Sequence, residues 1–315
     1  MGRMLTALAL IDIDAGTVTS THLESAQFPV EDLAIHRGEG IFETVLVSVD
    51  AETGAPRVHS EGPHFTRFEQ SAAMLDLPAP PRELFEEAVA AVITAVIGSA
   101  DLSTARGPVT EFSVRYAMSR GLDAHADPTA HRAAGVPHGA RGWAFPIGVT
   151  DGQRAQRTDG VRVVTLNRGY DAYVGESAPW LLIGAKTLSY AVNQAAARHA
   201  VAQGADEALF VSDDGIVLEG PTSNLVIQRG DTLLTPDPRA GLLHGTTQRA
   251  VFTGAEAAGL AVAYADLTID DVLEADAAWL VSSVRTAVPV LEVDGKTLPH
   301  DPASTSRLHG WIRAA

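Results

Sequence analysis

Lys186 is the residue on which amine chemistry in this chain depends, because the chain has only two lysines among its 23 basic residues. It follows the apolar run 181–185, so we expect its side chain to be partly buried. Burial lowers the pKa of a lysine and frees its amine to act as a nucleophile or a base. The alternative is a surface lysine whose stem covers apolar atoms while its ammonium stays in water.

The other lysine, Lys296, lies in the segment Val293–Leu298, which has the Asp-Gly signature of a tight hairpin turn. A side chain beside such a turn is expected to be exposed and inert. If the protein uses a lysine, the sequence therefore favours Lys186.

Two further motifs carry polar groups at points where elements begin or end. Glu219 enters a turn of small residues, 218–225, although such turns are also common as plain polar loops. The residues Gly245, Thr246 and Thr247 open a predicted helix. Backbone N–H groups, the helix dipole and hydroxyls at a helix start bind anions, but the same residues suit simple N-capping.

Two more features complete the set of candidate groups. Arg67 lies one turn into a predicted helix, and the segment Val281–Arg285 places two hydroxyls and a guanidinium at the end of a predicted strand. Each signal is weak by itself, but the order of these residues along the chain is informative about the family.

In that order the residues resemble the fold-type IV pyridoxal-phosphate enzymes, which include branched-chain and D-amino-acid aminotransferases and 4-amino-4-deoxychorismate lyases. The resemblance extends from His36–Thr44 to Pro289 and is most specific from Lys186 through Asn224. It implies an α/β (α+β) fold with a small N-terminal α/β domain, a larger pseudo-barrel-like C-terminal domain and the cofactor between them. It also implies a homodimer, in which a loop from the partner completes the active site.

The resemblance further implies that pyridoxal 5'-phosphate is the cofactor and assigns a role to each matching residue. Lys186 resembles the catalytic Schiff-base lysine, and Glu219 the acid that pairs with the pyridine nitrogen. Tyr190 resembles the tyrosine that bonds the phenolic oxygen of the cofactor. The phosphate is expected on Arg67, Asn224, Thr246, Thr247 and Ser283, and the small amino substrate on His36, Arg37, Phe42, Arg120 and Arg285.

The segments around Gly38–Thr44, Val114–Gly121 and Val281–Val290 resemble the lyase branch of the family. We therefore predict an aminodeoxychorismate lyase, which forms p-aminobenzoate and pyruvate. A D-amino-acid or branched-chain aminotransferase is the alternative, and Glu43 keeps it open because some lyases carry threonine at this position. Intact Lys186 and Glu219 argue against a third possibility, a non-catalytic paralogue.

Hydrophobic periodicity predicts the elements that position these groups. We expect strands at 5–13, 41–49, 109–118 and 143–149, and helices at 65–75 and 82–97, in a first domain over residues 1–149. A polar break at 150–157 is expected to be an interdomain linker. The second domain, 158–315, should be antiparallel α+β, with strands at 161–165, 207–212, 216–218, 224–228 and 232–234, and helices at 189–203, 246–258, 269–274 and 304–313.

Composition excludes several classes of protein. With no cysteine, the 315-residue chain has no disulfide framework and no thiolate metal site, and we expect no metal. Its net charge of −16 disfavours nucleic-acid binding. No apolar stretch reaches the ~20 residues that span a bilayer. We interpret Leu5–Ile11 as a strand and not a signal peptide, and expect a cytoplasmic protein.

Overall fold

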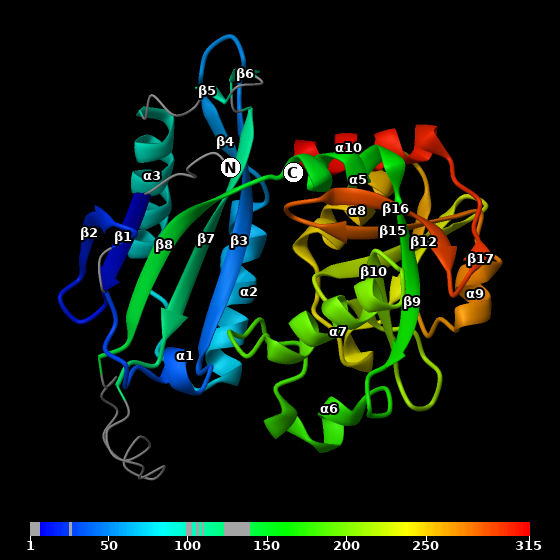
Figure 1. Cartoon of the computed structure of the whole chain (residues 1–315), viewed down its shortest axis with the longest axis horizontal. Helices are drawn as coiled ribbons and strands as arrows, with labels where there is room; N and C mark the ends of the chain where they lie inside the picture. Colours follow the sequence, from blue (N-terminus) through cyan, green and yellow to red (C-terminus); the bar gives the residue numbers. More distant parts are fainter. Residues whose placement is uncertain (1–6, 25–26, 99–102, 105–106, 109, 123–138) are drawn as a thin grey trace. The chain divides into compact units, whose positions relative to one another are not determined.

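The computed structural model describes residues 7–24, 27–98, 103–104, 107–108, 110–122 and 139–315, and these divide into two compact units (Figure 1). The first unit comprises Met1–Val149 together with the short segment Ala185–Tyr190. The second unit comprises Thr150–Gly184 and Ala191–Ala315. Lys186 therefore packs with the first unit, although it lies in the second half of the sequence.

The first unit is built on one antiparallel sheet in the order β2-β1-β8-β7-β3-β4. Two long helices, α2 and α3, pack against it. The elements are β1 (Ala7–Asp12), β2 (Thr17–His22), α1 (Leu33–His36), β3 (Gly40–Val49), β4 (Pro56–Val58), α2 (Glu61–Met74), α3 (Arg82–Gly98), β5 (Ser103–Thr104), β6 (Gly107–Pro108), β7 (Glu111–Ser119) and β8 (Arg141–Gly148).

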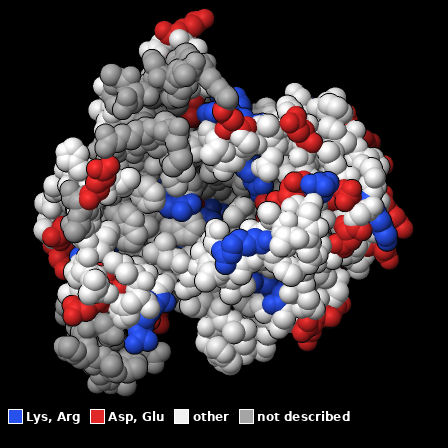
Figure 2. Space-filling view, in the orientation of Figure 1, with Lys and Arg blue, Asp and Glu red and all other residues white. Residues whose placement is uncertain are grey.

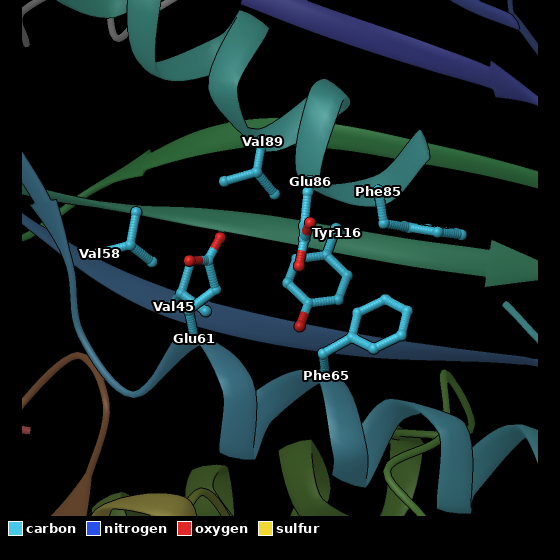
Figure 3. Close-up of a pocket in the computed structure, with 8 residues that line it drawn as sticks. All are labelled: Val45, Val58, Glu61, Phe65, Phe85, Glu86, Val89 and Tyr116. Carbon is cyan, nitrogen blue, oxygen red and sulfur yellow. The ribbon is translucent and has the colours of Figure 1, made fainter. Parts of the chain in front are cut away.

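Aromatic side chains fill the space between these helices and the sheet. Phe65 and Phe68 of α2 meet Phe85 of α3 and Tyr116 of β7, with ring centroids 5.0 to 6.4 Å apart. The helical spacing of the two α2 residues is the periodicity that predicted this helix, and the prediction is confirmed. Figure 3 shows a hollow at the edge of this packing, bordered by Val45, Val58, Glu61, Phe65, Phe85, Glu86, Val89 and Tyr116. It includes none of the predicted site residues.

The second unit contains a mixed sheet in the order β10-β9-β16-β15-β12-β13-β14. Three of its pairs, β10/β9, β16/β9 and β13/β14, are parallel, so the prediction of an antiparallel domain was wrong. The elements are α5 (Asp151–Asp159), β9 (Val161–Asn167), α6 (Val174–Ser177), η2 (Pro179–Leu181), α7 (Ala191–Ala202), β10 (Glu207–Val211), β11 (Glu219–Gly220), β12 (Ser223–Arg229), β13 (Thr232–Pro236), η3 (Pro238–Ala240), α8 (Thr246–Ala257), β14 (Ala261–Ala265), α9 (Ile269–Leu273), β15 (Ala277–Ser282), β16 (Thr286–Val293), β17 (Lys296–Thr297) and α10 (Pro302–Ala314).

Strand β12 shows how this sheet is buried on both faces. Leu225 and Ile227 belong to one apolar cluster, which includes residues of α9, whereas Val226 belongs to another on the opposite face, beneath α8 and α10. Successive side chains of a strand point to opposite faces, so a continuously apolar strand separates two cores. The central strand β12, which contains Asn224 and follows Glu219, is therefore packed on both faces.

The segment 150–157, which we expected to be a linker, begins a helix instead. Thr150 and Gln153 form a capping box at the start of α5. The helix is polar and has no apolar stripe, so periodicity could not reveal it. Arg157, near its end, donates hydrogen bonds to the carbonyl oxygens of Val284 and Arg285, which ties α5 to the second unit.

Two smaller expectations about the lysines can also be compared with the structure. Lys186 is partly buried, as predicted. Lys296 is exposed beside the turn formed by Asp294 and Gly295, both with positive φ, and this prediction is confirmed as well.

The surface charge and the helices of the described residues can be compared with the expectations from composition. On the face shown in Figure 2, acidic side chains are spread over the surface, and Lys and Arg form no continuous patch among the residues drawn there in colour. Within the described part of the chain, no helix has both the length and the apolar character needed to cross a membrane.

Candidate functional site

Lys186 is held against the edge of β3 in the first unit. Its carbonyl oxygen accepts the Phe42 N–H at 3.1 Å, and the Leu188 N–H donates to the Gly40 carbonyl at 2.8 Å. The N–H of Lys186 itself donates to Ser71 Oγ on α2 at 3.1 Å. Gly40 permits this approach, because a Cβ there would lie 2.7 Å from the Leu188 side chain. The backbone of the lysine is thus fixed by both a strand and a helix.

The side chain of Lys186 belongs to a group that we call the lysine cluster: Phe42, Arg115, Lys186 and Tyr190. The Lys186 ammonium and the Arg115 guanidinium each lie 4.6 Å from the centroid of the Phe42 ring. Tyr190 meets the same ring edge-on at 5.6 Å. An aromatic face attracts cations, so Phe42 gathers two positive groups at one place.

Arg115 is a functional candidate that the sequence analysis missed. Its Nε donates to Thr44 Oγ1 at 3.1 Å, and no carboxylate among the described residues pairs with it. Burial lowers the pKa of this arginine, because the charged form loses water. A mostly buried guanidinium without an acidic partner is costly to the fold, which makes it a candidate to bind an anionic ligand.

Arg67, the predicted phosphate arginine, is buried on α2 and faces Glu43. Its Nε and one terminal nitrogen contact the two carboxylate oxygens of Glu43 at 2.6 and 2.7 Å, and His64 Nδ1 contacts the same carboxylate at 2.7 Å. Burial by itself would raise the pKa of Glu43, but Arg67 and His64 outweigh it and hold that pKa well below its usual range. The pKa of His64 is lowered, chiefly by burial.

The second unit brings together a different group, the glutamate cluster: Glu219, Asn224, Thr246, Thr247 and Ser283. Glu219 and Asn224 are cross-strand neighbours in the β11/β12 pair. The Asn224 amide nitrogen donates to Glu219 Oε2 at 3.1 Å and to the Leu243 carbonyl at 2.8 Å. Asn224 was predicted at a phosphate, and here it joins the carboxylate to the segment that leads into α8.

The start of α8 has the composition of an anion site. Its N-cap residue, Gly245, contributes no side-chain hydrogen bond, and Thr246 and Thr247 are both buried in the first turn. Thr247 Oγ1 lies 3.4 Å from Ser283 Oγ. The Nε2 atom of Gln248 is buried without a hydrogen-bond partner among the described residues. A buried amide donor and hydroxyls beside a helix N-terminus suit a bound anion.

Of the five predicted substrate residues, only Phe42 lies in the lysine cluster. Arg120 donates to Glu39 Oε2 at 2.6 Å and to the carbonyl oxygens of Leu75 and Asp76, which follow α2. Arg285 is buried, and its guanidinium lies 2.6 Å from the Glu207 carboxylate. His36 and Arg37 are exposed, and His36 Nε2 lies 3.2 Å from the Glu31 carbonyl oxygen.

Comparison with known proteins identifies the family. The family profile described as amino-transferase class IV matches residues 40–293, which is most of the chain. The chain belongs to the amino-transferase class IV family. This confirms the family predicted from the order of the motifs, and with it an enzyme of the class IV aminotransferase/lyase type.

Two relatives in the class IV family are similar over most of their length. A bifunctional aminodeoxychorismate lyase / D-amino acid transaminase from Mycobacterium tuberculosis is 40% identical over 280 residues, covering 86% of this chain and 88% of the relative. Among solved structures, a fold IV-transaminase from Curtobacterium pusillum is similar with a TM-score of 0.82 and 37% identity, covering 98% of this chain and 97% of that one.

A PLP-bound aminotransferase structure from M. tuberculosis is similar with a TM-score of 0.82 and 34% identity, covering 97% of this chain and 98% of that one. These similarities confirm the mixed α/β fold-type IV architecture, with an antiparallel N-terminal sheet and a mixed C-terminal sheet.

Proposed function

We propose that the protein is a pyridoxal-phosphate-dependent aminodeoxychorismate lyase, which converts aminodeoxychorismate to p-aminobenzoate and pyruvate. The likeness to the bifunctional lyase and transaminase from M. tuberculosis supports this choice of reaction, because it extends over 86% of the chain. The observation that carries the proposal is that the Lys186 ammonium and the Arg115 guanidinium both lie over the Phe42 ring, while no carboxylate of the described residues pairs with Arg115.

Pyridoxal phosphate is the cofactor, and residues of the second unit fit two of its chemical groups. The turn at the start of α8 offers Thr246 and Thr247 for a phosphate, and the buried Nε2 of Gln248 offers a further donor. Glu219 offers a carboxylate for the protonated pyridine nitrogen. When bound, this cofactor supplies an electron-accepting ring that stabilises negative charge on the substrate carbon.

The chain's own side chains then have distinct tasks. We assign Lys186 to cofactor attachment and to moving the substrate proton, since it supplies the only partly buried amine of the two lysines. Arg115 is assigned to a substrate carboxylate, which would give its buried charge the partner that the described residues do not provide. The Glu43 carboxylate contacts the guanidinium of Arg67 through two nitrogens. These two contacts fix the orientation of the guanidinium.

A D-amino-acid aminotransferase is the second candidate function. The same relative carries this activity in its name. The two reactions use the same attachment lysine and differ in the fate of the substrate, so one protein can carry out both.

The deciding experiment measures products from purified holoenzyme given aminodeoxychorismate. The lyase proposal predicts p-aminobenzoate and pyruvate in equal amounts, and no product from the Lys186→Ala variant. D-alanine and L-leucine, each supplied with α-ketoglutarate, test transamination in parallel. Transamination without p-aminobenzoate would replace the lyase by the aminotransferase, and no turnover of any substrate would contradict both.

We also propose a homodimer, on the family resemblance stated above. Sedimentation of the holoenzyme should give twice the 33.1 kDa mass of the chain. A fully active monomer would contradict this assembly.

A further inference from the structure

Asn224 occupies a position in the glutamate cluster that its predicted role did not explain. The residue is buried, with 6% of its surface exposed, and it lies opposite Glu219 across the β11/β12 pair. Cross-strand partners share one face of a sheet, so the amide and the carboxylate must face each other. The β-structure thereby fixes which group Asn224 contacts.

The orientation of the Asn224 amide follows from its two partners. Its nitrogen contacts Glu219 Oε2 and the Leu243 carbonyl oxygen, both of which are acceptors. Only the NH₂ side of the amide can donate to both at once, and each of its two hydrogens has one acceptor. A carboxylate at position 224 would instead place oxygen against oxygen at both contacts.

The backbone before α8 is shaped to receive this amide. A Cβ on Gly245 would lie 1.9 Å from Asn224 Oδ1 and 2.8 Å from its Cγ, so any other residue would displace the asparagine or the helix start. Leu243 lies two residues before Gly245, which is the N-cap of α8. One side chain therefore contacts both Glu219 and the loop that begins the predicted phosphate site.

The turn between β11 and β12 has other supports, so Asn224 is not needed to hold it. Asn193 of α7 donates to the Pro221 carbonyl at 2.8 Å. Arg285 donates to the hydroxyls of Thr222 and Ser223 at 3.3 and 3.4 Å. The two hydrogen bonds of Asn224 consequently contact Glu219 and the segment before α8 rather than the turn.

We propose that Asn224 is a positioning residue, which sets the orientation of Glu219 relative to the start of α8. The inference rests on the proposed function, in which Glu219 serves the pyridine nitrogen and α8 the phosphate. Two ends of one rigid ligand require a fixed separation between their binding groups. Asn224 maintains that separation, because one planar amide bonds both Glu219 and the Leu243 carbonyl, which lies two residues before the N-cap of α8.

The test uses apo-protein titrated with pyridoxal phosphate, and measures the dissociation constant for the wild type and for Asn224→Ala, Asn224→Asp, Glu219→Ala and the double alanine variant. Gln228→Ala is the matched control, because Gln228 lies on the same strand and its amide also bonds a backbone carbonyl, that of Gly230. Circular dichroism and melting temperature verify that each variant folds.

We expect Asn224→Ala and Asn224→Asp each to weaken cofactor binding on the order of tenfold, the loss typical of one hydrogen bond to a charged group. Asn224→Asp keeps the size of the side chain, so its failure identifies amide donation as the cause. In the Glu219→Ala background, Asn224→Ala should add less than about twofold, because residues that act through each other are not additive. Gln228→Ala should bind like the wild type.

Two results would overturn the proposal while leaving the proposed function intact: wild-type affinity in Asn224→Asp, or alanine effects that multiply in the double variant. Either would make Asn224 an ordinary packing residue. If the wild type itself bound no pyridoxal phosphate, the proposed function would fail and this inference with it.

Discussion

The lysine cluster and the glutamate cluster differ in how the fold surrounds their charged groups. In the lysine cluster, two cations lie over the Phe42 ring, and no carboxylate among the described residues pairs with Arg115. In the glutamate cluster, the negative charge of Glu219 is bonded by an amide, and hydroxyls surround the start of α8. A charge that the fold leaves uncompensated indicates a ligand, whereas a charge fixed by neutral donors indicates a group whose direction matters.

Two buried arginines illustrate the same difference. Arg285 lies against Glu207 at 2.6 Å and is part of the structure of the second unit. Arg115 is also mostly buried, but its polar contact is the Thr44 hydroxyl. Breaking a buried ion pair is strongly destabilising, whereas removing a buried charge that has no partner is not.

Lys186→Ala should have the largest effect. It removes the amine that attaches the cofactor and moves the proton, so turnover should fall by about 10⁴-fold or more, as for other residues that act covalently. The visible absorbance of the lysine-bound cofactor should disappear, while circular dichroism stays unchanged. Lys296→Ala, at the exposed hairpin, is the matched control and should retain full turnover. Equal loss in both variants would contradict the assignment.

Glu219→Gln should reduce turnover by roughly 10²-fold, comparable with removal of one electrostatic donor from an active site. The variant keeps the size and hydrogen-bonding capacity of the side chain but not its charge. It should therefore still fold and bind pyridoxal phosphate, as measured by absorbance titration. Wild-type turnover would make Glu219 an ordinary loop carboxylate.

Arg115→Gln should raise the KM for a carboxylate substrate by about 10- to 100-fold, the range expected for a lost charged hydrogen bond. Its free energy of unfolding in urea should stay at or above that of the wild type.

Arg285→Gln is the contrast to Arg115→Gln. It should lower the free energy of unfolding by about 3 kcal/mol, since it leaves Glu207 buried and unpaired. Arg82→Gln, which removes an exposed ion pair with Glu86, should change neither quantity.

Glu43→Gln tests the buried pair with Arg67 through its pH dependence. The pKa of Glu43 is lowered from 4.5 in the folded protein, so its stabilising contribution is present above that pH and is lost as the pH falls further. The free energy of unfolding of the variant should be about 3 kcal/mol lower than that of the wild type at pH 7. This difference should shrink below pH 4.5. Urea denaturation at several pH values measures it. A difference that stays constant with pH would show that the charge of Glu43 is not involved.

Sequence reasoning was most successful where a signal is local. The helices α2 and α3 follow from the spacing of their apolar residues, and the hairpin beside Lys296 from its Asp-Gly pair. The helix α5 was missed because it is polar, and its Thr150/Gln153 capping box was the available signal. The parallel pairs of the second unit were missed because strand patterns do not specify the direction of pairing.

The non-local parts of the site needed the fold. Arg115 lies 71 residues from Thr44, and only the β3/β7 register brings them together. Asn224 was found by its sequence context, but its partners depend on the β11/β12 pair and on the approach of Gly245. The attachment of the Lys186 segment to the first unit also had no local signature, since its contacts are with β3 and α2.

Because the chain has only two lysines, peptide mapping can identify which of them holds the cofactor. Holoenzyme is reduced with borohydride, digested and mapped by mass spectrometry. We predict a single pyridoxyl-phosphate adduct, on the peptide that contains Lys186, and none on the peptide that contains Lys296. An adduct on Lys296 alone, or no adduct on either peptide in protein that carries the cofactor, would contradict the assignment of Lys186 as the attachment lysine.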